Sequence, residues 1–282
     1  MKSNPFFSIV IATYNFGRFL PQAIESVISQ SCQDYELIIV DGGSSDNTLE
    51  VIHHYEKYIS WWVSEPDKGQ SNAFNKGFAH SKGKFLTWLN ADDLYLPGTL
   101  ESVKRKLMAH PDAEWATGNF LRFRDSDKVI IEAKWGPHIL PSFMQTSDSP
   151  LVIFGPTTFW SRKIYEDVGE LDESLHYAMD TDYWCRIVKK EYEQVRVNHC
   201  CWAFRMHVDS KTAEFDNHHA DEQTKRIKRL EAQYIQDKSK LVVAKKKKYL
   251  GYFLRILDGS FFILLYNKLF VVGREFNKFR EL

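Results

Sequence analysis

Two adjacent carboxylates follow a largely apolar run of the chain. The run Phe-Leu-Thr-Trp-Leu at 85–89 leads into Asn-Ala-Asp-Asp at 90–93. Such a run predicts a buried parallel strand, and open α/β sheets bind ligands at the carboxyl ends of these strands. Because carboxylates beside an amide suit a hard divalent cation, Asp92 and Asp93 are candidates for a site that holds a diphosphate. The alternative is a solvated turn ahead of the Pro-Gly pair at 97–98.

Other acids are placed to join them. Asp41 ends a second apolar run, and Asp180 and Asp182 form a later pair. In a parallel sheet these groups would converge on one edge. The first predicted strand is followed by a turn with only Gly17, so GxGxxG is missing there, and GxxxxGK[ST] is also missing. Any nucleotide is therefore expected to be held by strand-end side chains and a metal.

Strands and helices are predicted to alternate through the first third of the chain. Apolar runs predict strands at 6–12, 36–41, 61–64 and 85–89, and helical periodicity predicts helices at 19–28, from 49, and at 71–80. This alternation predicts an α/β fold with a mostly parallel central sheet flanked by helices.

The pattern is less regular after Pro97. We expect a helix at 99–109, a short strand at 114–118, a hairpin at 120–131, and a loop at 137–150 that could cover a site.

The C-terminal part has a different character. From residue 224 a charged helical pattern leads to four consecutive lysines at 245–248 and then to a segment rich in Leu, Phe and Ile. The predicted organisation is a catalytic domain at 1–222 and a helical appendage at 223–282. Residues 261–272 are too short an apolar stretch to span a bilayer, which leaves an in-plane membrane helix or a helix packed on its own domain or on a dimer partner.

Composition excludes few classes of protein. Lys plus Arg and Asp plus Glu both number 37 of 282 residues, so no overall charge attracts nucleic acid. The four cysteines show no zinc-site spacing, which indicates reduced thiols. The start of the chain lacks the pattern of a secretory signal, so a cytoplasmic catalytic region is expected.

Four segments carry a resemblance to a known family. They are residues 8–15 (SIVIATYN), 38–48 (IIVDGGSSDNT), 65–71 (EPDKGQS) and 88–93 (WLNADD). In this order they resemble the motifs of family 2 glycosyltransferases with the GT-A fold, whose first half is a Rossmann-like nucleotide-binding unit. The resemblance covers roughly residues 6–215.

The resemblance implies a nucleotide-sugar donor, expected to be a UDP-sugar. The residues that it assigns to the donor are Thr13, Tyr14, Asn15, Asp41, Asp67, Gln70, Asn75, Asn90, Ala91 and Lys211. Asp41 would accept a hydrogen bond from the base or ribose, or would instead cap the following turn. Gly42 stands where the family usually has a second acid. Asp67, Gln70 and Asn75 are expected near the ribose and sugar, or are surface polar residues.

The metal and the base follow from the same resemblance. Residues 90–92 correspond to the family's DxD motif, so Asp92 is the expected ligand of Mn²⁺ or Mg²⁺, with His207 as a second ligand or as a structural histidine. Asp180 is the expected catalytic base, since Met179 takes the usual Glu position, and Asp182 is the alternative base. The base would take the proton of the attacking acceptor hydroxyl.

The acceptor side is assigned to Thr157, Trp160 and Trp184, although core packing is the alternative for the tryptophans. The predicted function is metal-dependent, inverting glycosyl transfer in the assembly of surface polysaccharide, glycolipid or lipid-linked oligosaccharide. The expected partners are a saccharide or glycolipid acceptor and, through the C-terminal segment, the cytosolic face of a membrane. Oligomers are possible. The alternative function is a non-catalytic sugar-nucleotide-binding or membrane scaffold. Donor sugar, acceptor and linkage stay open.

Overall fold

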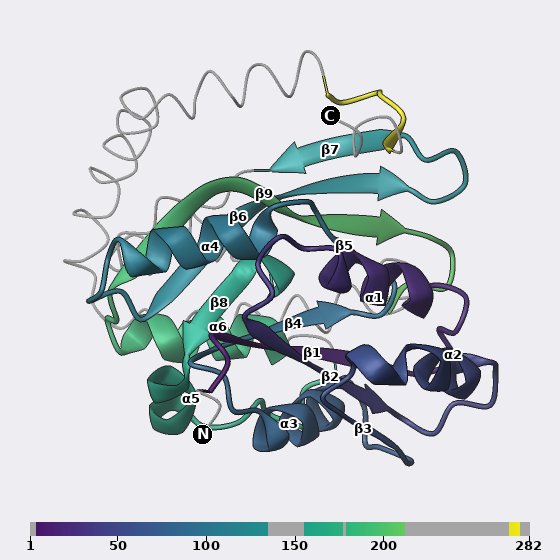
Figure 1. Ribbon diagram of the computed structural model, residues 1–282, viewed down its shortest axis with the longest axis horizontal. Helices are drawn as coiled ribbons and strands as arrows, with labels where there is room; N and C mark the ends of the chain where they lie inside the picture. The colour runs from purple at the N-terminus through teal and green to yellow at the C-terminus, as the bar shows by residue number, and fades with distance from the viewer. Residues whose placement is uncertain (1–3, 135–154, 177–178, 212–270, 277–282) are drawn as a thin grey trace.

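The computed structural model describes residues 4–134, 155–176, 179–211 and 271–276, which form a mixed α/β structure around one sheet (Figure 1). Its strands are β1 (Phe7–Thr13), β2 (Tyr35–Asp41), β3 (Trp61–Ser64), β4 (Phe85–Asn90), β5 (Leu94–Tyr95), β6 (Trp115–Arg124), β7 (Ile130–Lys134), β8 (Thr158–Ser161) and β9 (Gln194–Met206). Its helices are α1 (Leu20–Ile28), α2 (Thr48–Tyr55), α3 (Gln70–His80), α4 (Thr99–Met108), α5 (Arg162–Val168) and α6 (Met179–Lys189), with short 3-10 turns η1 (Glu56–Tyr58) and η3 (Gly155–Thr157).

The first half of the sheet has the predicted parallel arrangement. Its order is β3-β2-β1-β4, and all three pairings are parallel. Thr13 at the end of β1 lies beside Asp41 at the end of β2, and Ala12 lies beside Asn90 of β4. The residues that follow these strands therefore share one edge of the sheet.

The second half is mixed, and here the predicted elements were partly wrong. The expected break near Gly118 does not interrupt the strand, because β6 runs on to Arg124 and forms a hairpin with β7. Instead the register against β9 shifts on both sides of Asn119. A Cβ at Gly118 would lie 2.4 Å from the sulfur of Cys201. Glycine therefore permits the close approach of β9 at this irregularity.

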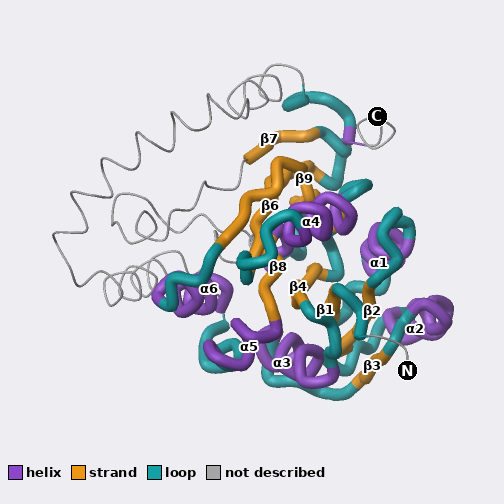
Figure 2. Tube along the Cα trace, turned by 60° about the vertical axis from the view of Figure 1, so that its left-hand side comes forward, coloured by secondary structure: helices purple, strands orange, loops and turns teal. Residues whose placement is uncertain are grey.

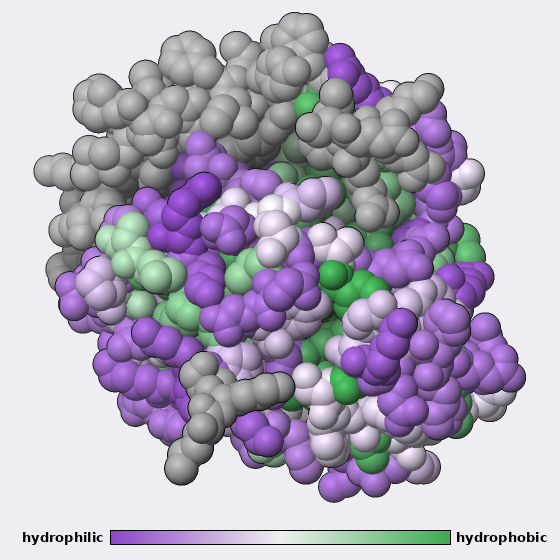
Figure 3. Space-filling model, in the orientation of Figure 1, coloured by the Kyte–Doolittle hydropathy of each residue, from purple (hydrophilic) through white to green (hydrophobic). Residues whose placement is uncertain are grey.

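Helices cover both faces of the sheet (Figure 2). Alternate residues of β1 face opposite layers: Ile9 and Ile11 pack with α1, α2 and α4, whereas Val10 packs with α3, α5 and α6. This alternation is the period-2 pattern of a strand that is buried on both sides. The surface outside these layers is mainly hydrophilic on the face shown in Figure 3.

Part of the C-terminal region lies against the sheet. Residues 271–276 lie beside the β6–β7 turn, where Val129 and Glu275 form an antiparallel bridge. Val271 and Phe276 are buried in a third apolar cluster with residues of β5, β6 and β9. At the end of the 261–272 segment Val271 is therefore packed on the domain, while Val272 is 38% exposed. Residues 137–150 and the rest of the appendage lie outside the described residues. Among the helices that are described, none combines the length and the apolarity needed to cross a bilayer.

Candidate functional site

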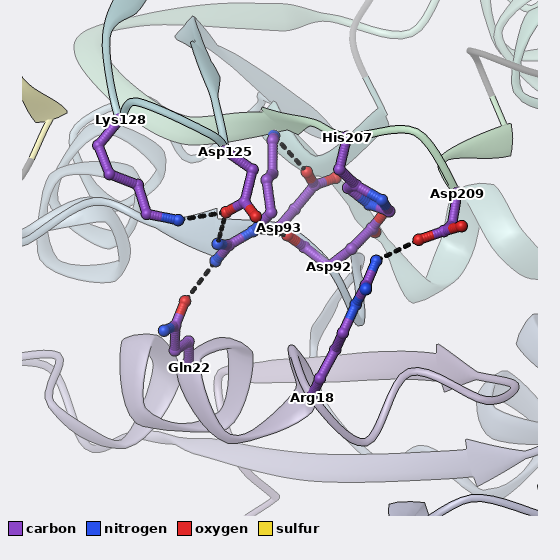
Figure 4. A network of polar contacts seen from close by, with 9 residues as sticks. Arg18, Gln22, Asp92, Asp93, Asp125, Lys128, His207 and Asp209 are labelled. Atoms are coloured by element: carbon purple, nitrogen blue, oxygen red, sulfur yellow. Dashed lines mark hydrogen bonds and ion pairs between the residues drawn. The ribbon is translucent and has the colours of Figure 1, made fainter.

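Asp92 and His207 meet across 115 residues of sequence. Asp92 follows β4 and His207 follows β9, and the Oδ2 of Asp92 lies 2.9 Å from the Nε2 of His207 (Figure 4). Both side chains are largely buried, with 13% and 4% exposed. The imidazole packs on Phe19, whose ring centre is 4.5 Å away, and edge-on against Phe16. Its Nδ1 is buried and has no hydrogen-bond partner within the described residues.

This pair fits a divalent cation. Two ligands at right angles around an ion about 2.1 Å away are about 3.0 Å apart, close to the observed separation. Carboxylate oxygen and imidazole nitrogen are also the donor types that Mn²⁺ accepts. No third His, Cys, Asp or Glu joins them in the described ranges. A site of this kind would leave most coordination positions to phosphate oxygens and water, as is common for Mg²⁺ with nucleotides.

Asp93 points the opposite way, so the expectation that both acids of the pair face the site was wrong. Its carboxylate is fully buried and accepts hydrogen bonds from the backbone N–H of Arg205 (2.9 Å) and from the side-chain amide of Asn90 (2.8 Å). Burial and the neighbouring charge of Asp92 raise the pKa of Asp93 well above its usual range, although these hydrogen bonds oppose the shift. Asp93 is thus an internal anchor for the loop that carries Asp92.

Arg205 stabilises the loop that carries Asp92 and Asp93. Its side chain is buried, and its Nε donates to the backbone carbonyl of Asp92 at 2.7 Å. Its two terminal nitrogens donate to Asp125 (2.7 Å) and Gln22 (2.5 Å), which come from the β6–β7 turn and from α1. Burial opposes ionisation of Asp125, but hydrogen bonds from Lys128 and Arg205 outweigh it and hold the pKa of Asp125 below its usual range. The guanidinium is therefore paired and hydrogen-bonded as a buried charge must be.

An exposed ion pair joins the turn before α1 to the segment that follows His207. Arg18, in the turn before α1, contacts the carboxylate of Asp209, two residues after His207 (Figure 4). Both side chains are more than half exposed, so the contact contributes little to stability. It nevertheless places a cationic group beside the Asp92–His207 pair.

Side-chain hydrogen bonds link Asn90, two residues before Asp92, to the start of α3. The Nε2 of Gln70 donates to the Oδ1 of Asn90 (3.1 Å), and the Oε1 of Gln70 accepts from the Nζ of Lys211 (3.2 Å). Three residues assigned to the donor thus gather at one rim. The positive charge of Lys211 also acts on Asp180, which lies in the first turn of α6. Lys211, which bonds Gln70 at the rim, is therefore within electrostatic range of the candidate base.

The structure separates the two candidate bases. The carboxylate of Asp182 is buried and pairs with Arg186 at 2.8 Å, while Arg186 also donates to two backbone carbonyls. Asp180 is partly exposed and accepts only from its neighbour Thr181 among the described contacts. Burial raises the pKa of Asp180 above its ordinary value, against the Thr181 hydrogen bonds and the charge of Lys211. Asp182 is thus committed to a buried ion pair, whereas the Oδ2 of Asp180 accepts no hydrogen bond from the described residues and is the better placed of the two to take a proton.

The ends of β1 and β2 offer a second polar region. The hydroxyl of Thr13 is buried with no hydrogen-bond partner among the described residues, and the ring of Tyr14 is 60% exposed. Asn15 has a left-handed φ of 57° and is tied to Ser44 by a 2.7 Å hydrogen bond from its backbone N–H. An orphaned hydroxyl beside an exposed ring suits a planar polar ligand.

Asp41 fits the capping alternative better than a direct ligand contact. Its carboxylate is fully buried and accepts from the backbone and hydroxyl of Ser44 and from the hydroxyl of Ser64. Three of its roughly four acceptor positions are therefore used within the protein.

Asp67 occupies the space beside Gly42. A Cβ at Gly42 would lie 2.6 Å from the Oδ2 of Asp67 and 3.4 Å from the ring of Tyr14. The other oxygen of Asp67 accepts from the backbone N–H of Gly69 at 2.7 Å. The acid that is missing at position 42 is thus replaced in space by the carboxylate of Asp67.

Several residues that were assigned to the site lie elsewhere, because their side chains serve the core. Asn75 is buried and bonds both the N–H and the C=O of Leu171, so it joins α3 to the loop before α6. The methyl group of Ala91 is buried in the core, as is Thr157. Trp160 and Trp184 are at most 1% exposed, and their rings pack against Trp88. None of these side chains presents a surface to a ligand.

The residues that sequence reasoning missed are those that support the site rather than form it. They are Arg18, Gln22, Asp125, Lys128 and Asp209. Arg18, Gln22, Asp125 and Lys128 lie outside every motif, since each is a single polar residue in a turn or on a helix surface. Asp209 occupies a variable position of the segment 205–212 (RMHVDSKT), which resembles the family's Arg-x-His-x-x-Ser-Lys-Thr ending, and Arg205 is the first residue of that motif.

The chain is similar to known proteins in sequence and in fold. The family described as glycosyl transferase family 2 matches residues 8–169. An uncharacterized glycosyltransferase of Rickettsia typhi is 30% identical over 198 residues, which are 67% of this chain and 61% of that protein. The chain therefore spans about three fifths of that relative's length.

Solved structures share the fold at low sequence identity. TarS of S. aureus in complex with UDP-GlcNAc matches with a TM-score of 0.61 and 16% identity, over 82% of this chain and 66% of that one. The mannosyltransferase PcManGT of Pyrobaculum calidifontis, in complex with GDP-Man and Mn2+, matches with a TM-score of 0.56 and 16% identity, over 95% and 82%. With the family match over more than half of its residues, the chain belongs to glycosyl transferase family 2 and has a GT-A type fold.

Proposed function

We propose that this chain transfers a sugar from a nucleotide-diphosphate sugar, a UDP-sugar, to an acceptor hydroxyl with inversion at the anomeric carbon. Asp92 and His207 would hold Mn²⁺ or Mg²⁺, which when bound would neutralise charge on the departing diphosphate. The TarS and PcManGT complexes with sugar nucleotides support this donor class. The observation that carries the proposal is the 2.9 Å separation of Asp92 and His207, with Lys211 bonded to Gln70 and Gln70 bonded to Asn90 nearby.

The protein's own groups supply the other parts of the reaction. The carboxylate of Asp180 takes the proton of the acceptor hydroxyl as that oxygen forms a bond to the anomeric carbon. The bond from this carbon to the phosphate oxygen breaks on the opposite side, and the nucleoside diphosphate leaves with the electron pair. Lys211 and Arg18 place positive charge at the rim where the negative charge grows.

The donor nucleotide would lie at the ends of β1 and β2. The unpartnered hydroxyl of Thr13, the exposed ring of Tyr14 and the free oxygen of Asp67 supply a hydrogen-bond partner, a stacking surface and an acceptor. Gln70 and Asn90 lie between this region and the metal pair.

The experiment is an assay of UDP release from a panel of UDP-sugars, with Mn²⁺ and without it, in wild type and in Asp180→Asn. We expect release from at least one donor with the wild type and a loss of roughly a hundredfold or more in Asp180→Asn, which should still bind UDP. Wild-type release by Asp180→Asn would remove this residue from the mechanism. Absence of UDP binding by the wild type would refute the donor class, whereas UDP binding without release from any donor would favour the sugar-nucleotide-binding scaffold.

The C-terminal segment bears on the cellular setting of the reaction. Assembly of surface polysaccharide, glycolipid or lipid-linked oligosaccharide at the cytosolic membrane face would suit the basic and apolar residues 245–270. Flotation of the full chain with anionic vesicles tests it, and recovery of all protein in the bottom fraction would contradict it.

A further inference from the structure

Residues 271–276, drawn in yellow in Figure 1 and here called the C-terminal brace, form a close contact with the β6–β7 turn. The ring of Phe276 stacks on Phe123 with centres 4.1 Å apart and planes within 8°. Backbone hydrogen bonds join the brace to the β7 end of the turn: Phe276 N–H donates to the carbonyl of Lys128 (2.6 Å), and Ile130 N–H donates to the carbonyl of Arg274 (2.8 Å). Phe276 is almost fully buried in this contact.

The turn that receives the brace is strained. Lys128 has a left-handed φ of 55°, which costs a non-glycine residue free energy unless its surroundings hold it. Two contacts hold it here: its side chain pairs with Asp125, and its carbonyl accepts from Phe276. The conformation of the turn therefore depends in part on the brace.

The same turn contacts Met206 and Arg205, and through them it is connected to both residues of the candidate metal pair. The backbone N–H of Asp125 donates to the carbonyl of Met206, next to His207, at 2.9 Å. The carboxylate of Asp125 and the ring of Phe123 both contact Arg205, whose Cζ is 5.2 Å from the ring centre. Arg205 in turn bonds the backbone carbonyl of Asp92 and, through its own N–H, the carboxylate of Asp93.

We propose that the C-terminal brace positions the Asp92–His207 pair, with Phe276 as its principal positioning residue. Stacking on Phe123 and bonding to Lys128 fix the turn, the turn fixes Arg205 and Met206, and these fix the loops that carry the two ligands. The part of this inference that concerns metal rests on the proposed function, whereas the coupling between brace and loops does not.

The test compares Phe276→Ala and Phe276→Leu with wild type in the full chain. Hydrogen exchange of the metal-free protein reports on the amides of Asp125 and Arg205, and electron paramagnetic resonance reports on Mn²⁺ binding in the presence of UDP. Ile164→Ala is the matched control, because Ile164 is fully buried on α5 in a different apolar cluster. It should lower the melting temperature without changing exchange at these two amides.

In Phe276→Ala we expect exchange at Asp125 and Arg205 to be roughly threefold to tenfold faster, and Mn²⁺ binding to weaken by a similar factor. Phe276→Leu keeps most of the apolar contact and should lie between this variant and wild type, and it serves alone if the alanine variant does not fold. Unchanged exchange at both amides in the variants that fold would overturn the inference. If exchange at Asp125 and Arg205 is faster in the Phe276 variants but the wild type binds neither Mn²⁺ nor UDP, the positioning role of the brace is supported and the proposed function is refuted.

Discussion

Replacing Arg205 by Lys tests whether the loop of Asp92 is held as the structure indicates. The guanidinium donates three side-chain hydrogen bonds, to the Asp92 carbonyl, to Asp125 and to Gln22. A lysine keeps the charge and can keep the Asp125 contact, but its single nitrogen cannot reach all three acceptors in this fork. Two bonds from a charged donor are lost, each contributing about 1.5–3 kcal/mol, so we expect Arg205→Lys to lower the free energy of unfolding by about 3 kcal/mol or more.

Urea unfolding followed by tryptophan fluorescence measures this change, and a thermal scan should show a fall of about 6–12 °C in melting temperature. Arg124→Lys is the matched control, because Arg124 is 53% exposed and its ion pair with Asp127 lies on the surface. That variant should change stability by less than about 0.5 kcal/mol. Equal and small effects for the two variants would show that the Arg205 network does not hold the loop.

Three further predictions concern the site. Burial raises the pKa of Asp180, and a base works only when deprotonated, so turnover should be full above this pKa and fall as pH falls through it. The acid limb of the kcat profile should thus lie above the ordinary Asp value of about 3.9, and a limb at that value would contradict the assignment. Asp182→Asn breaks the ion pair with Arg186, so the free energy of unfolding measured in urea should fall by about 1–3 kcal/mol while turnover stays measurable. Complete inactivity of the folded variant would make Asp182 the base. Gly42→Asp should abolish UDP binding measured by calorimetry, because its side chain clashes with Asp67. The double variant Gly42→Asp with Asp67→Gly should restore UDP binding. If the double variant binds UDP no more tightly than the single variant, Asp67 does not replace the missing acid.

The parallel half of the fold was predictable because its signals are local. Continuous apolar runs ending in polar turns marked β1, β2 and β4, and helical periodicity marked α1 and α3. The mixed half was harder to predict, since Gly118 has the pattern of a strand break but serves the close approach of β9. Only the contact with Cys201 distinguishes the two interpretations.

The motifs single out Asp92 and His207, which each follow a strand and meet in the structure. Asp180 and Asp182 were expected at a strand end, but they lie in the first turn of α6, and their roles stay predictions. The direction of a side chain was not predictable from the motif alone: Asp93 and Asp92 are neighbours in sequence, yet one is buried and the other faces the rim. The tryptophans at 160 and 184 were assigned to the acceptor by residue type, but three mutually packed indoles form a core instead. Long-range partners such as Asp125 leave no pattern in the sequence because their contacts form only in the folded chain.

The measurement that tests the central claim most directly is calorimetric titration of UDP into wild type and Asp92→Asn, each with Mn²⁺ and without it. We expect Mn²⁺ to strengthen UDP binding by the wild type roughly tenfold or more, and to have little effect on Asp92→Asn, because the amide is a weaker ligand beside His207. If Mn²⁺ strengthens UDP binding equally in both proteins, the metal is not held by Asp92 and the proposed arrangement of the site is wrong.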